Sequence, residues 1–303
     1  MAHLGHGLSI SDIKGKETMY SYGIAFANIR IYIESCFEIK INKESLPFIL
    51  KDQDKYDINL KFISNNNLKE PIHTTEWMED KLYTYEKNIP VTYVREFEGK
   101  SPYAKVIYNE KLIEILYLKN KESYFSNTHD ILNLIGLEKI LLDHSGFLLH
   151  SSLIDYKGKG ILFSAPCGVG KSTQANLWEK YKNSEILNGD RAGLRWNQNE
   201  WRAYGMPFAG TSGIYKNTST TVAAIVTLEQ NNENKIRRLA PMEAIRRLLP
   251  ECNCRRWDAA FMDHLLNLLV MLVQRVPIYL LQCRPDEEAV DVLFQRLKQE
   301  ELI

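Results

Sequence analysis

The feature that most constrains the fold is a short glycine-containing segment at residues 165–173, which follows an apolar stretch. It has the Walker A spacing, except that alanine stands where the first glycine is usual. In such a loop, backbone N–H groups and the N-terminus of the next helix form a positive cradle for phosphates. The predicted nucleotide-binding residues are Ala165, Pro166, Cys167, Gly168, Val169, Gly170, Lys171, Ser172 and Thr173.

Two side chains of this loop have separate expected roles. Lys171 should reach the β- and γ-phosphates of ATP and take part in catalysis, and the Ser172 hydroxyl should bind Mg²⁺. The apolar residues 161–164 predict a strand before the loop, and residues 171–181 predict a helix after it. A glycine-rich turn without a ligand is the alternative, but the length of the pattern favours nucleotide binding, with ATP and Mg²⁺ as cofactors.

Asp190 is the predicted catalytic carboxylate. It follows Lys171 by 19 residues, which leaves room for a helix, a turn and a short parallel strand at residues 185–187. Its side chain would then lie at the carboxyl end of that strand, where open α/β sheets bind ligands. There it could bind Mg²⁺ or accept a proton from an attacking hydroxyl. The alternative is an aspartate that caps a helix or closes a turn.

His150 is predicted to lie beside the phosphate loop because of hairpin geometry. If residues 155–160 form the loop of a hairpin, Ile154 pairs with Ile161 and His150 lies opposite Ala165. The imidazole could then balance phosphate charge or relay a proton. A structural histidine is the alternative.

Residues 205–213 combine three glycines with two hydroxyl side chains. This composition predicts either a loop that closes over the site or a surface connection.

The length of 303 residues favours two domains. The pattern of the first half predicts a β-rich domain, and residues 119–127 are predicted to form a linker. The remainder is predicted to be an α/β domain with alternating strands and helices. We therefore expect domains at residues 1–127 and 128–303, the first a candidate for substrate recognition. In the first domain, β-branched and aromatic residues predict strands at residues 22–32, 56–63, 91–97 and 111–118.

Charge and cysteine content exclude several classes of protein. The chain has 38 basic and 38 acidic residues, so its formal net charge is zero and no overall basic field would attract nucleic acid. Its five cysteines form no even, closely spaced framework, which favours a reduced, cytoplasmic location. Residues 1–15 have no signal-peptide core, and residues 265–281 fall short of a membrane span. We expect neither nucleic acid nor membrane as a partner and leave homo-oligomerisation open.

With these residues, the second half resembles the catalytic domain of HPr kinase/phosphorylase, a P-loop family related in core structure to phosphoenolpyruvate carboxykinase. The similarity covers roughly residues 143–296 and has three features. A strand bearing His150 precedes the loop, the loop ends with the residues at 168–172, and a later apolar strand ends at Asp190. The resemblance implies an α/β P-loop kinase core like the C-terminal domain of HPr kinase, preceded here by a smaller β-rich α+β domain.

Residues 188–191, 205–213 and 276–279 are similar to a divergent HPr-kinase-like subgroup, some members of which resemble lasso-peptide precursor serine kinases. Two positions depart from the bacterial HPr kinases. Gly189 stands where those enzymes carry the first of two adjacent aspartates, and Arg202 stands in place of a metal-binding glutamate. The departures argue against HPr as the substrate and against phosphorylase activity.

Three functions remain open at this point. The preferred hypothesis is an ATP- and Mg²⁺-dependent kinase that phosphorylates a Ser or Thr hydroxyl of a peptide or protein, such as a ribosomally made precursor peptide. In it, Asp190 would act as the base and His150 would assist. The alternatives are a nucleotide-binding regulatory module with weak transfer activity, and a kinase for a small metabolite. The sequence does not identify the acceptor.

Overall fold

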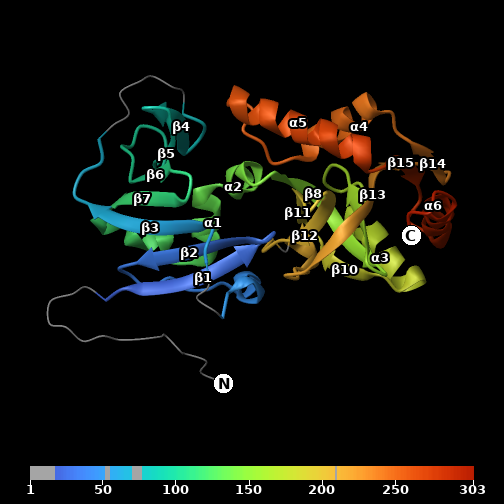
Figure 1. Ribbon diagram of the computed structural model, residues 1–303, viewed down its shortest axis with the longest axis horizontal. Coiled ribbons are helices and arrows are strands. Elements are labelled where there is room, and N and C mark those ends of the chain that lie inside the picture. Colours follow the sequence, from blue (N-terminus) through green and yellow to red (C-terminus); the bar gives the residue numbers. More distant parts are fainter. Residues whose placement is uncertain (1–17, 52–54, 70–76, 209) are drawn as a thin grey trace. The chain divides into compact units, whose positions relative to one another are not determined.

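The structure is a computed structural model that describes residues 18–51, 55–69, 77–208 and 210–303. It divides into two compact units, Met1–Ile135 and Gly136–Ile303 (Figure 1). The residues examined above for a signal peptide lie outside the described ranges, and so does Ala209 in the glycine-rich loop. Among the described helices, none has the length and apolar character needed to span a membrane.

The first unit is built on one seven-stranded mixed sheet with the order β1-β2-β3-β7-β6-β5-β4. Side chains alternate between the two faces of each strand, and this defines the buried face of the sheet. In β2, Ile29, Ile31 and Ile33 are buried, while the residues between them are partly exposed. The β2–β3 and β3–β7 pairs are parallel, and the other pairs are antiparallel. The elements are β1 (Tyr20–Phe26), β2 (Ile29–Ser35), η1 (Lys43–Phe48), β3 (Ile58–Asn65), β4 (Lys81–Glu86), β5 (Ile89–Val94), β6 (Ala104–Tyr108), β7 (Leu112–Leu118), η2 (Lys119–Phe125) and α1 (Thr128–Ile135).

Two sequence-based expectations for this unit are wrong, and two of its strands were missed. Residues 22–32 form a β1–β2 hairpin rather than one strand, because Ala27 and Asn28 adopt positive φ angles that turn the chain. Residues 119–127 are not a linker, since they contain η2 and its buried Phe125. Strands β4 and β6 were not predicted.

The boundary between the two units follows α1, whereas the sequence suggested a boundary between residues 127 and 128. The Thr128 hydroxyl at the start of α1 lies 2.8 Å from Asn42 Oδ1 and 2.9 Å from Ser45 Oγ. These contacts join α1 to η1 of the first unit. The chain then leaves the helix at Gly136, whose φ of 65° ends α1 and starts α2. The residues on the two sides of Gly136 therefore form two separate helices.

The second unit has an eight-stranded sheet with the path β10-β8-β11-β12-β13-β15-β14, and β9 pairs with both β8 and β13. Strands β8, β11, β12, β13 and β9 thus close a ring. The elements are α2 (Leu137–Asp143), β8 (Gly146–Tyr156), β9 (Lys159–Ser164), α3 (Lys171–Lys182), β10 (Glu185–Asn188), β11 (Arg191–Asn197), β12 (Glu200–Gly205), η3 (Gly210–Ser212), β13 (Ser219–Gln230), β14 (Lys235–Arg238), α4 (Pro241–Leu248), η4 (Leu249–Glu251), α5 (Ala259–Arg275), β15 (Ile278–Cys283) and α6 (Glu287–Gln299).

Helices cover both faces of this sheet, which is why its central strands are apolar without interruption. Leu162 of β9 and Leu280 of β15 belong to a core cluster with α4 and α5. Phe163 and Leu281, the next residue in each strand, pack instead in a cluster with α3 and α6. Figure 1 shows α4 and α5 together on one side of the sheet and α3 on the other. The expected mixed α/β architecture is confirmed.

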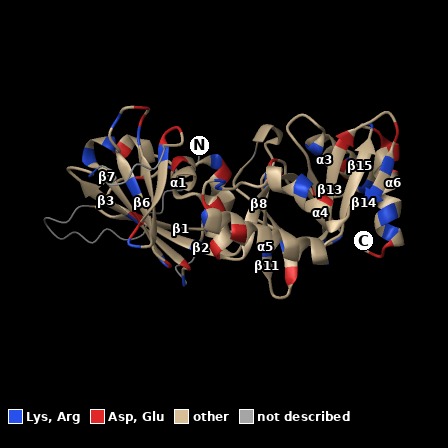
Figure 2. Ribbon diagram, turned by 90° about the horizontal axis from the view of Figure 1, so that it is seen from above, with Lys and Arg blue, Asp and Glu red and all other residues tan. Residues whose placement is uncertain are grey.

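The strand that leads to Asp190 differs from the prediction. Strand β10 pairs with β8 in the antiparallel sense, at the edge of the sheet, whereas a parallel strand was expected. Only β9–β13 and β13–β15 are parallel among the described pairs of this unit. Asp190 therefore lies at the junction between β10 and β11, two strands that both pair with β8. In each unit, acidic and basic residues are interspersed along the ribbon (Figure 2).

Candidate active site

The phosphate-type loop lies between β9 and α3, as the sequence predicted. Gly168 and Gly170 have φ angles of 80° and 125°, which other residues rarely adopt, and this explains glycine at both positions. A Cβ on either would meet nothing within 4 Å, so the requirement is conformational rather than steric. Ala165 is buried in the α3/α6 core cluster and is not among the described residues with positive φ, so alanine is tolerated there.

The first turn of α3 is open to an anion. Its N-cap, Gly170, has no side chain to accept hydrogen bonds from the first N–H groups of the helix. These N–H groups, together with the positive end of the helix dipole, attract negative charge. Ser172 is partly exposed in this turn, and Thr173 is exposed. The arrangement is suited to a phosphate group with a metal ion beside it.

Lys171 is nearly buried and folded back onto the loop. Its Nζ donates to the Ala165 carbonyl at 2.7 Å and to the Pro166 carbonyl at 3.2 Å. Burial lowers the pKa of Lys171, and the charges of Glu251 and Asp190 oppose this shift. The Lys171 ammonium group is thus fixed on the loop by two backbone carbonyls, and carboxylates from two other segments favour its charged form.

Asp190 is positioned by Asn188, a residue for which the sequence predicted no role. The carboxamide of Asn188 is fully buried and makes four hydrogen bonds. Its Oδ1 accepts from the backbone N–H groups of Asp190 at 3.0 Å and Arg191 at 2.8 Å. Its Nδ2 donates to the carbonyls of Met206 at 2.9 Å and Phe208 at 3.1 Å. Asn188 therefore connects the Asp190 turn to the start of the glycine-rich loop.

That loop, at residues 205–213, packs directly against the Asp190 turn. A Cβ on Gly210 would lie 2.8 Å from the Cβ of Asp190. A Cβ on Gly189 would collide with the Ser212 hydroxyl and lie 2.5 Å from the Ser212 Cβ. Glycine at position 189 is therefore required by close packing, which explains why a second aspartate is not accommodated there. Ser212 is one of the two hydroxyl side chains that the sequence marked in this loop, although its contact with Gly189 was not predicted.

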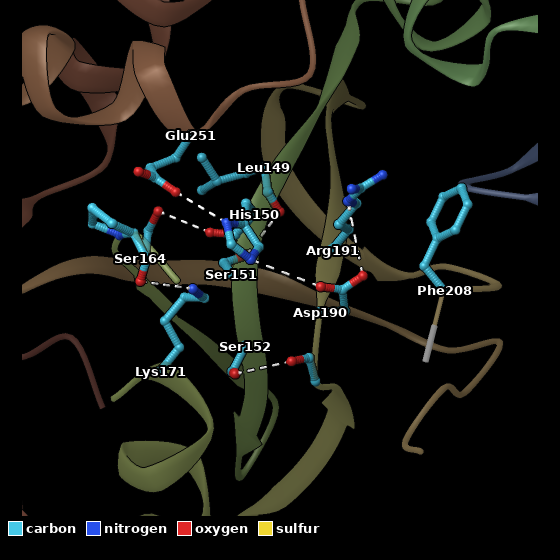
Figure 3. Close-up of polar contacts among 12 residues, drawn as sticks. Leu149, His150, Ser151, Ser152, Ser164, Lys171, Asp190, Arg191, Phe208 and Glu251 are labelled. Atoms are coloured by element: carbon cyan, nitrogen blue, oxygen red, sulfur yellow. Dashed lines mark hydrogen bonds and ion pairs between the residues drawn. The ribbon is translucent and has the colours of Figure 1, made fainter. Parts of the chain in front are cut away.

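The predicted register of the His150 hairpin is confirmed. Ile154 pairs with Ile161, and Ser151 pairs with Ser164, so His150 lies next to the end of β9. The turn itself is shorter than expected, because β8 and β9 continue to Tyr156 and Lys159. The side chain of His150 is directed away from the core and lies between two carboxylates (Figure 3).

The two carboxylates are those of Asp190 and Glu251, and the sequence analysis did not predict a role for Glu251. Its Oε2 lies 3.1 Å from Nδ1 of His150, while Nε2 of the same ring lies 3.8 Å from Oδ1 of Asp190. The glutamate ends η4, and the residues after it are fixed to β8, since Cys252 forms a bridge with Leu149. No local pattern marks Glu251, because 101 residues separate it from His150.

Arg191 and Arg202 have different surroundings. The guanidinium of Arg191 lies over the Phe208 ring at 5.7 Å, and its Nε lies 3.8 Å from Asp190 Oδ2. Arg202 bonds with Glu200 and Ser219 on the β12–β13 surface. Of these two arginines, Arg191 therefore lies near Asp190, whereas Arg202 is engaged by residues of other strands.

The metal predicted here would need ligands from the nucleotide. Within the described part of the chain, no group of three or more His, Cys, Asp or Glu side chains is arranged to hold a metal ion. One hydroxyl and one carboxylate, such as those of Ser172 and Asp190, are a donor set that Mg²⁺ uses when substrate phosphates and water complete its shell. The residues present fit such an ion.

The family described as "SynChlorMet cassette protein ScmC" matches residues 115–287. No curated protein matches the sequence. Among solved structures, the HPr(Ser) kinase/phosphatase from Coxiella burnetii matches with 13% sequence identity and a TM-score of 0.31, covering 50% of this chain and 98% of that chain.

Proposed function

We propose that this chain, which belongs to the family of the SynChlorMet cassette protein ScmC, is an HPr-kinase-like, kinase-type nucleotide-binding protein. More specifically, it transfers the γ-phosphoryl group of ATP to a Ser or Thr hydroxyl of a peptide or protein. A ribosomally made precursor peptide is the acceptor that the sequence resemblance suggests. Support comes from the loop, which has an uncapped helix N-terminus and two glycines in positive-φ conformations. It also has a nearly buried lysine whose charged form is favoured by Glu251 and Asp190.

In the proposed reaction, different residues bind the phosphates, stabilise the developing charge and accept the proton. The loop N–H groups and Lys171 bind the β- and γ-phosphates and stabilise the charge that develops on the leaving group. Ser172 and Asp190 would hold Mg²⁺, which would neutralise phosphate charge. Asp190 accepts the proton of the acceptor hydroxyl as its oxygen attacks phosphorus, and the bond to the ADP oxygen breaks. His150 assists because its Nε2 faces Asp190.

One observation supports the alternative of a regulatory module with weak transfer activity. Gly189 replaces a second carboxylate, and its contact with Ser212 leaves no room for a larger residue. Asp190 would then have to act as both base and metal ligand. A kinase for a small metabolite stays as the third candidate. Incubation with γ-labelled ATP and separate peptide, protein and metabolite pools distinguishes the three by which pool, if any, becomes labelled.

The experiment that tests nucleotide binding is the substitution Lys171→Ala. We expect loss of productive ATP binding, because the loop loses its phosphate-directed point charge. Lys180→Ala is the matched control, since Lys180 lies in the last turn of the same helix and is exposed. Binding is measured by calorimetry with MgATP. Equal affinity in a folded Lys171→Ala variant and in the wild type would refute the proposal.

A further inference from the structure

The polar cluster around His150 contains Glu251, a residue to which the proposed function assigns no role. Figure 3 shows the imidazole between Glu251 and Asp190, with Lys171 on the loop below. The two ring nitrogens have different partners: Nδ1 is within hydrogen-bond distance of Glu251, and Nε2 is within ion-pair distance of Asp190. A histidine with unequal partners at its two nitrogens has a preferred tautomer.

Glu251 is placed for this role by its backbone. The Asn253 N–H donates to the Leu148 carbonyl at 3.1 Å, and Cys252 forms a bridge with Leu149. These bonds fix the end of η4 against β8, one residue before His150. The side chain of Glu251 is only 11% exposed, so its carboxylate cannot move freely into water. The His150 ring is 29% exposed, which leaves it open to exchange a proton with solvent.

We propose that Glu251 is a positioning residue, which accepts the Nδ1–H of His150 and so leaves the lone pair of Nε2 directed toward Asp190. A carboxylate that accepts from one ring nitrogen fixes the tautomer and orientation of a histidine that exchanges a proton at the other. The inference rests on the proposed function, because it assigns the path of the proton that transfer releases.

The proton path conserves atoms and charge. The acceptor oxygen forms its bond to the γ-phosphorus while the bond to the ADP oxygen breaks, and ADP leaves with that electron pair. Asp190 receives the hydroxyl proton. It then passes the proton to Nε2 of His150, directly or through one water, which regenerates the Asp190 carboxylate. The resulting imidazolium lies between two carboxylates, and its proton passes to solvent.

The alternative role for Glu251 is to balance the charge of Lys171, since its charge opposes the lowering of the lysine pKa. The two roles predict different couplings. A residue that acts through His150 has no effect once His150 is removed. A residue that acts on Lys171 has the same effect with or without the imidazole, and it changes ATP affinity.

The first measurement is the tautomer of His150, which needs no turnover. The full chain is labelled with ¹⁵N-histidine, and the His150→Ala spectrum identifies the signal among the seven histidines. At a pH where the ring is neutral, we expect a protonated Nδ1 in the wild type and loss of this preference in Glu251→Ala. Glu243→Ala is the matched control, because Glu243 pairs with Arg237 on the exposed surface of α4. An unchanged tautomer in Glu251→Ala would overturn the proposal.

The second measurement is a double-mutant cycle with Glu251→Ala, His150→Ala and the combined variant. Phosphoryl transfer is followed or, with no acceptor added, MgATP hydrolysis. We expect Glu251→Ala to lower kcat by about 10- to 100-fold, the usual effect of removing a residue that orients a histidine, with KM for ATP unchanged. The combined variant should match His150→Ala. Multiplicative losses, or a raised KM for ATP, would assign Glu251 to Lys171 instead. Absence of MgATP binding by the wild type would refute the kinase proposal, while the tautomer would still decide the role of Glu251.

Discussion

The four hydrogen bonds of Asn188 give a prediction whose size follows from the structure. Substitution Asn188→Ala leaves the N–H groups of Asp190 and Arg191 and the carbonyls of Met206 and Phe208 without their partner. A buried polar group left unsatisfied costs about 1–3 kcal/mol. Water can reach part of this turn, since Asp190 and Arg191 are partly exposed, so we expect a net loss of about 2–4 kcal/mol rather than the full sum.

For a unit the size of Gly136–Ile303, this loss corresponds to a fall in Tm of roughly 5–15 °C. Because the chain has two units, hydrogen exchange measured by mass spectrometry is the better local assay. We expect faster exchange at residues 189–191 and 205–208, together with slower phosphoryl transfer, since Asp190 loses its fixed position.

Asn231→Ala is the matched control for this prediction. Its side chain accepts one hydrogen bond at 3.0 Å, from the Glu233 N–H on the exposed surface. We expect its effect on stability to stay within about 0.5 kcal/mol. If Asn188→Ala changes Tm and exchange no more than Asn231→Ala does, the reasoning that Asn188 holds the Asp190 turn is refuted.

Two further predictions concern the same turn. Asp190→Asn keeps the shape of the side chain but removes its charge, so we expect MgATP binding to persist and transfer to fall by about 10² or more, measured with labelled ATP; an unchanged rate would place the base elsewhere. Gly189→Ala should lower transfer and stability because its Cβ collides with Ser212. The added substitution Ser212→Gly should restore part of both, and a double variant as impaired as Gly189→Ala alone would contradict the steric explanation.

The prediction of the fold was most accurate where strands are buried on both faces or joined by tight turns. The β8–β9 pairing followed from a short loop, and the mixed α/β architecture followed from alternating apolar segments. Strand direction was harder to predict, since nothing in residues 185–188 distinguishes a parallel strand from the antiparallel β10. Its direction depends on β8, which lies earlier in the chain and also pairs with β11.

The sequence by itself determined the loop, because its properties depend on neighbours only a few residues apart. Glycine at positions 168 and 170 sets the positive φ angles, and Lys171 starts the helix that the loop leads into. The surroundings of this loop were decided by the tertiary structure alone. Glu251 contacts His150, and Ser212 excludes a side chain at Gly189, through packing between segments distant in sequence. Local sterics are fixed by residue type, whereas such contacts exist only after the strands have paired and η4 has been fixed against β8.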